Sequence, residues 1–107
     1  MIPSKFCIGG GKEIKIYLVD RLLDDNGNSR FGEFNEASNI IKIAKNVKAD
    51  SIWYSLTNED IERTFWHELI HCFQFYAGMD TDEMVAQTFS NFIWEYNHTK
   101  GYEDNFS

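Results

Sequence analysis

The stretch His67-Glu68-Leu69-Ile70-His71 decides how this chain is interpreted, because two histidines four residues apart enclose a glutamate. On an α-helix, residues four apart lie one above the other on the same face. Two imidazoles in that arrangement can both bind one zinc ion, each at about 2.1 Å. Glu68 projects roughly 100° around the helix from His67, where it is poorly placed as a ligand but can reach a water on the metal. The H-E-x-x-H pattern therefore predicts a metallopeptidase site with Glu68 as the general base.

A helix over residues 58–77 is predicted around this motif. Thr57 with Asp60 three residues later resembles a capping box, and Gly78 is a natural residue just beyond the C-terminal end. Apolar residues recur at the helical period and lie opposite His67. They are Ile61, Phe65, Leu69, Cys72, Phe73 and Tyr76. The alternative, a helix that carries two histidines with no shared role, is disfavoured because the histidines face away from the centre of this stripe, toward a cleft or solvent.

A catalytic zinc ion generally takes three protein ligands. The extended metzincin pattern is excluded, because Ala77 stands where its third histidine would be. Glu83 is the best remaining candidate, with Asp80 and Asp82 behind it. Glu83 falls in the first turn of a second predicted helix, over residues 81–97. Asp80-x-x-Glu83 is also a capping-box pattern, so on geometry alone Glu83 is either a ligand or a helix cap.

The N-terminal half predicts β-structure, which makes the chain α+β. A short strand before the Gly9-Gly10-Gly11 turn is followed by strands over residues 13–20, 31–34 and 39–44. Residues 24–28 give a strong turn signal. Residues 47–56 form a connection without a predicted element, and the polar tail over residues 100–107 is expected to fray.

The stretch from Thr64 to Tyr96 resembles the gluzincin-type zincin core. It is most similar to the very small zincin-like metallopeptidases encoded in phages and mobile elements, and more distantly to the ImmA/IrrE metallo-endopeptidases. The segments over residues 6–10 and 31–43 resemble the N-terminal strands of that group. The resemblance implies a small twisted antiparallel or mixed sheet packed on an active-site helix, followed by a second helix that carries a glutamate. It also implies that His67, His71 and Glu83 bind zinc.

The chain departs from gluzincins at Gln87, which replaces an aspartate that often orients a ligand histidine in them. By resemblance, residues 39–44 would be the edge strand that binds peptide, although a covered edge is an equal alternative. Hydrolysis also needs a second electrophile beside the metal. Tyr54 is preferred for this role, ahead of Tyr76, Tyr96 and His98, and none of them lies in a recognisable motif.

Length and composition set limits on the class of protein. A chain of 107 residues with 43% hydrophobic residues predicts one globular domain over residues 1–107. No apolar run is long enough to span a membrane, and without an export signal the expected location is the cytoplasm. A net charge of −7 without a basic patch disfavours nucleic acid as a partner. Cys7 and Cys72 are expected to be buried thiols, with Cys7 as a removable fourth zinc ligand as the alternative.

The expected function is zinc-dependent hydrolysis of a peptide or protein substrate. One alternative is a zinc-binding zincin fold with little intrinsic activity, which serves as an interaction module. Another is a helix-and-sheet domain that binds no metal. Because so small a chain has few loops, a partner protein or a homodimer could complete its cleft.

Overall fold

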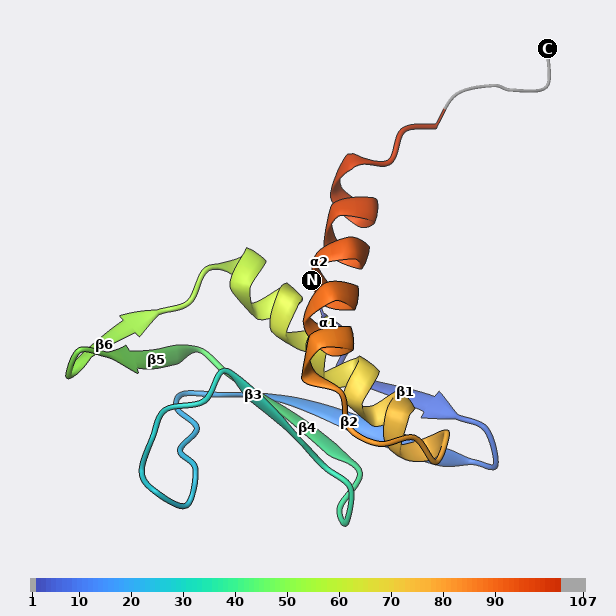
Figure 1. The fold of residues 1–107 in the computed structure, drawn as a ribbon, viewed down its shortest axis with the longest axis horizontal. Helices are drawn as coiled ribbons and strands as arrows, with labels where there is room; N and C mark the ends of the chain where they lie inside the picture. Colours follow the sequence, from blue (N-terminus) through green and yellow to red (C-terminus); the bar gives the residue numbers. More distant parts are fainter. Residues whose placement is uncertain (1, 103–107) are drawn as a thin grey trace.

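The chain forms a mixed β-sheet and two helices, seen in a computed structural model that describes residues 2–102 (Figure 1). The strands are β1 (Lys5–Ile8), β2 (Lys12–Val19), β3 (Gly32–Asn35), β4 (Ile40–Ala44), β5 (Asn46–Ala49) and β6 (Ile52–Ser55). The helices are α1 (Asn58–Tyr76) and α2 (Glu83–Thr99). The predicted α+β class and the four N-terminal strands are confirmed. Of the predicted polar tail, residues 103–107 lie outside the described part of the chain.

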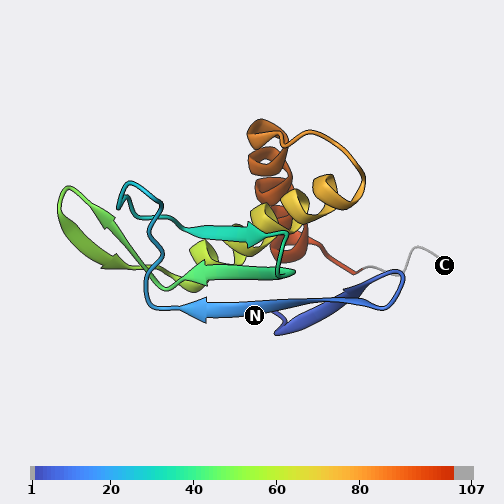
Figure 2. The ribbon, with the colours of Figure 1, turned by 90° about the horizontal axis from the view of Figure 1, so that it is seen from below.

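The four-stranded sheet has the order β1-β2-β4-β3. The outer pairs β1–β2 and β3–β4 are antiparallel, whereas β2 and β4 are parallel (Figure 2). The prediction that residues 39–44 form the edge strand is wrong, because β4 lies between β2 and β3. Ile41, Ile43 and Ala44 are fully buried, as the nearly continuous apolar run of β4 requires of a central strand. The edge beside α1 belongs to β3.

Residues 47–56, which had no predicted element, form most of a separate β5–β6 hairpin. Its two-residue turn has positive φ angles at both Asp50 and Ser51, as a type I′ turn requires. The sequence signal was weak because these positions usually hold asparagine and glycine. Figure 1 shows the hairpin projecting beyond the N-terminal end of α1.

Helix α1 begins and ends as the sequence predicts. The Thr57 side chain accepts a hydrogen bond from the Asp60 amide, and the Asp60 carboxylate accepts one from the Thr57 amide, which completes the capping box. At the other end, Gly78 has a φ of 71°, and the Met79 amide donates to the Gln74 carbonyl. This is a Schellman motif, which only a left-handed residue after the helix allows.

One face of α1 packs on the sheet and forms the core. Phe65 and Cys72 contact the buried isoleucines of β2 and β4. Phe73 does not follow the predicted stripe, since its side chain is 57% exposed. Cys7 also departs from prediction, because it lies on the exposed face of β1. Strand alternation explains this, since its neighbours Phe6 and Ile8 take the inner face.

Helix α2 begins beside the middle of α1 and runs away from the sheet (Figure 1). It starts two residues later than predicted, because Asp82 is the N-cap and accepts a hydrogen bond from the Val85 amide. The alternative in which Asp80 and Glu83 form a capping box is therefore wrong. Neither helix, within the described residues, is long and apolar enough to cross a membrane.

Candidate metal centre

Helix α1 places the two histidines of the motif side by side. The Nε2 atoms of His67 and His71 lie 3.1 Å apart. Their side chains are 19% and 12% exposed, so both rings are largely shielded while their Nε2 atoms face a common point. The four-residue spacing on a regular helix accounts for this placement.

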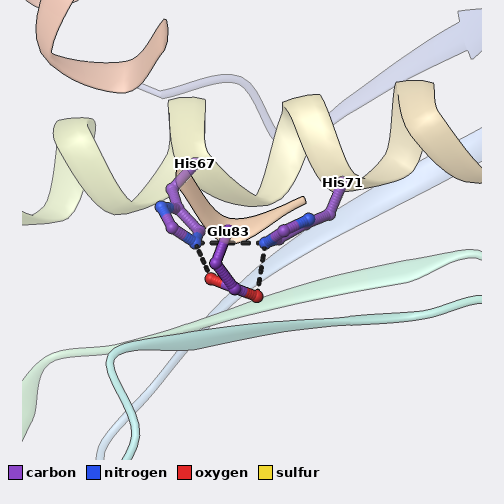
Figure 3. A group of neighbouring side chains, drawn as sticks. All are labelled: His67, His71 and Glu83. Atoms are coloured by element: carbon purple, nitrogen blue, oxygen red, sulfur yellow. Dashed lines mark hydrogen bonds and ion pairs between the residues drawn. The ribbon is translucent and has the colours of Figure 1, made fainter. Parts of the chain in front are cut away.

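Glu83, the first residue of α2, completes the group. Its Oε2 lies 3.0 Å from His67 Nε2, and its Oε1 lies 3.0 Å from His71 Nε2. Figure 3 shows both imidazoles and the carboxylate pointing at one another from two different helices. His67, His71 and Glu83 could therefore hold a metal ion together.

The chemistry of these atoms fits a metal. His71 Nδ1 lies 3.0 Å from Gln74 Oε1, which can only accept, so Nδ1 carries the hydrogen and Nε2 presents a lone pair. That lone pair then faces a carboxylate oxygen and another imidazole nitrogen. A cation between the three groups, or a further proton on a ring, removes the repulsion. Ligands about 2.05 Å from a tetrahedral zinc ion would lie about 3.3 Å apart, close to the spacing found here.

Gln74 connects the two sides of the site by hydrogen bonds, and the sequence analysis missed this role. Its side chain is 1% exposed. While Oε1 accepts from His71, the same amide also bonds both the N–H and the C=O of Asp82, at 3.3 and 3.4 Å. Gln74 therefore orients a histidine on α1 and fixes the residue that precedes Glu83. The signal was its position, seven residues after His67 and so on the histidine face of the helix.

Gln87, by contrast, lies on the cavity wall beside these residues. It is the residue at which the sequence departs from the gluzincin pattern, in which an aspartate often orients a ligand histidine. Gln74, one turn after His71 on α1, bonds that histidine instead.

Glu68 lies in the same cavity, which has a volume of about 470 Å³. The side chain is nearly buried, at 8% exposure. Burial raises the pKa of its carboxyl to about 7, while the nearby charges of His71 and Arg30 act in the opposite direction. A cation at the histidines would also lower this pKa, because it favours the carboxylate.

Close packing of β3 against α1 fixes the position of Glu68. A Cβ atom on Gly32 would lie 2.7 Å from Thr64 Cγ2 and 3.1 Å from Glu68 Cγ. Only glycine lets the edge strand approach the helix this closely. The backbone of β3 therefore forms the cavity wall next to Glu68.

The other candidate residues lie elsewhere. Asp82 caps α2, and the metal-binding group found in residues 2–102 includes neither Asp82 nor Asp80. Tyr54 lies on the β5–β6 hairpin, outside the residues that line the cavity in the described part of the chain. His98 pairs with Glu62 and stacks on Trp94.

Two tyrosines and a cysteine from the sequence analysis are also away from this group. Tyr76 donates a hydrogen bond to Asn39, and Tyr96 is 55% exposed on α2. Neither lines the cavity that the described residues form, nor does Cys7.

Comparisons with protein-family models, with curated proteins and with solved structures find no match to this chain. The chemistry of the site is therefore inferred from its own residues.

Proposed function

We propose that this chain is a zinc-dependent peptidase with a zincin-like fold of the gluzincin type. The observation that carries the proposal is the convergence of His67, His71 and Glu83 beside the buried carboxyl of Glu68. Two imidazoles and one carboxylate are a common ligand set for catalytic zinc, which keeps a further position open for water. The same set is less suited to magnesium or calcium, which prefer oxygen ligands.

The metal and the residues that line the cavity have different roles in the proposed hydrolysis. Zinc, when bound, lowers the pKa of a water and polarises a carbonyl oxygen. Glu68 accepts the proton of the attacking water and delivers it to the leaving amine. Its position suits this exchange, because its carboxyl lines the same cavity as the two histidines and Glu83.

A peptide substrate would bind along β3. This strand pairs with β4 on one side and, within the described residues, leaves its other edge unpaired. Peptide backbone can add to such an edge by main-chain hydrogen bonds that do not depend on sequence. Gly32 brings that edge against Glu68, so a bound peptide bond would lie near the general base.

A second candidate is a zinc-binding module with little activity of its own. It is favoured by the position of Tyr54, since the preferred second electrophile lies outside the cavity. In this case a partner protein or a second copy of the chain would complete the cleft.

Zinc content tests the metal site. We expect one zinc per wild-type chain by elemental analysis, and loss of most of it in Glu83→Ala. Glu95→Ala, on the same helix, is the matched control and should keep the metal. A wild-type chain that takes up no zinc when it is supplied would contradict the proposal.

Cleavage of a mixture of unstructured peptides, followed by mass spectrometry, separates the two candidates. Glu68→Gln should keep zinc and lose activity by about 10²- to 10⁴-fold. A zinc-loaded wild type that cleaves no peptide would instead support the interaction module.

A further inference from the structure

Two arginines line the cavity beside the histidines, and their guanidinium groups are bound very differently. Arg63 donates to Glu59 at 3.1 Å and to Asn91 at 2.7 Å, and it lies over the ring of Trp94 at 4.2 Å. Its side chain is 26% exposed. Arg63 therefore holds α2 against α1 and has little freedom to bind a ligand.

Arg30 is much less constrained. Its Nη1 lies 3.5 Å from Glu33 Oε2, and its side chain is 46% exposed. This contact with Glu33 is long and lies between partly exposed side chains, so it is weak and exchanges readily. The guanidinium can therefore leave Glu33 for an anionic group that enters the cavity, and its two parallel N–H donors match a carboxylate.

The charge of the cavity favours such a ligand once metal is bound. Arg30 and Arg63 are its basic residues, and Asp60, Glu68 and Glu83 are its acidic residues. Counted over these lining side chains alone, a divalent ion changes the balance from one negative to one positive charge. The metal therefore makes the surroundings of Arg30 less negative, in a chain whose net charge is −7. Partly shielded charges at this short range act more strongly than the distant surface.

The direction of β3 indicates which part of a peptide would reach Arg30. Gly32 packs beside Thr64, whereas Phe34, further along β3, contacts Phe75 near the end of α1. Arg30 precedes the Gly32 end of the strand. A peptide that pairs antiparallel with β3, the more stable arrangement, would have its C-terminal side at this end.

We propose that Arg30 determines specificity by binding a carboxylate on the C-terminal side of the bound peptide. The carboxylate belongs either to the chain terminus or to an acidic side chain. This inference rests on the proposed peptidase function. It gives Arg30 a role in substrate selection, in addition to the effect of its charge on Glu68.

Binding of three zinc-directed probes tests this without a known substrate. Each is a succinyl-hydroxamate dipeptide, in which the zinc-binding group precedes the peptide. The first ends in a free carboxylate, the second has a carboxamide end and a glutamate side chain, and the third has a carboxamide end and a glutamine. Dissociation constants are measured by calorimetry on the zinc-loaded protein.

We expect at least one acidic probe to bind wild type about tenfold more tightly than the neutral probe. Which acidic probe does so identifies the source of the carboxylate. Arg30→Gln should remove the preference and leave the affinity for the neutral probe unchanged. Arg21→Gln is the matched control, because Arg21 lies over Trp53 on the hairpin, and it should keep the preference. Glu33→Gln keeps Arg30 and should keep or increase the preference.

Three results would overturn the inference, and they are distinguishable. Equal binding of all probes to wild type would remove the role of Arg30 and leave the zinc site intact. Equal weakening of all three probes in Arg30→Gln, with unchanged zinc content and melting temperature, would show that Arg30 acts on the zinc-binding group. Binding of none of the probes to the zinc-loaded protein would contradict the proposed peptidase function, because the metal would offer no open position, and the inference would fail with it.

Discussion

At the scale of single residues, a neutral side chain orients the candidate site. Gln74 is buried between His71 and the backbone of Asp82 and bonds to both. A glutamine can bond a histidine N–H and a peptide group at once, whereas a carboxylate can only accept. The same residue therefore orients a ligand and positions the start of the helix that carries Glu83.

Gln74→Leu should weaken zinc binding by about 10- to 100-fold, because His71 loses the acceptor that fixes its ring. The affinity is measured by competition with a chromogenic chelator. Gln87→Leu is the control, because Gln87 lines the same cavity whereas Gln74 is the residue bonded to His71. The Gln87→Leu variant should bind zinc nearly as tightly as wild type. Loss of zinc affinity in Gln87→Leu with none in Gln74→Leu would reverse this assignment.

Gly32 is the second residue on which the site depends. Gly32→Ala should lower the free energy of unfolding by about 1–3 kcal/mol, because its Cβ would press on Thr64 and Glu68. Chemical denaturation measures the change. Gly9→Ala adds the same methyl group where no atom lies within 4 Å, so its denaturation midpoint should stay close to that of wild type. Equal midpoints for the two variants would mean that β3 can move away from α1 at no cost.

At the scale of elements, α1 carries most of the residues of the site, and both of its ends are fixed by hydrogen bonds. The capping box at Thr57 fixes its first turn, and the Schellman motif at Gly78 fixes its last turn. The last turn contains Gln74, so the helix end and the ligand support are one structure. A change in how α1 ends should therefore affect both stability and metal binding.

Gly78→Ala should destabilise the protein by about 1–2 kcal/mol, because an L-residue is strained at a φ of 71°. It should also weaken zinc binding, since the Gln74 carbonyl accepts the hydrogen bond that closes this turn. Thermal melting and chelator competition give the two values. Gly101→Ala, beyond the end of α2 in open space, is the control. If stability fell while zinc affinity stayed at the wild-type value, the helix end and the site would be independent.

At the scale of the whole molecule, the proposed metal would connect two helices that already pack on each other. Helix α2 packs mainly on α1, and only Ala86 and Ser90 are buried along it. Ion pairs and ring contacts around Arg63 and His98 connect the helices further along. Near the start of α2, the histidines with Glu83 and Gln74 with the backbone of Asp82 form the connection.

Zinc should therefore stabilise the folded chain as a ligand that binds only the native state. At free zinc 1,000 times its dissociation constant the gain is about 4 kcal/mol, which raises the melting temperature by roughly 10 °C or more. A chelator should reverse the shift, and Glu83→Gln should reduce it strongly, whereas Glu95→Gln should retain it. An equal shift in all three proteins would mean that the metal binds somewhere other than the proposed centre.

The sequence by itself determined the parts of this protein that depend on local spacing. The pairing of His67 with His71, the limits of α1 and the four strands follow from helical and strand periods and from capping residues. The assignment of Glu83 remained open, because a residue twelve positions after His71 can approach it only if the intervening chain turns back. Local spacing also does not determine the order of the strands in the sheet, and the prediction of the edge strand was wrong for that reason. Tertiary structure alone decided which strand lies against Glu68, that Gln74 supports His71 and that Arg30 enters the cavity, because each depends on contacts between segments that sequence periodicity does not relate.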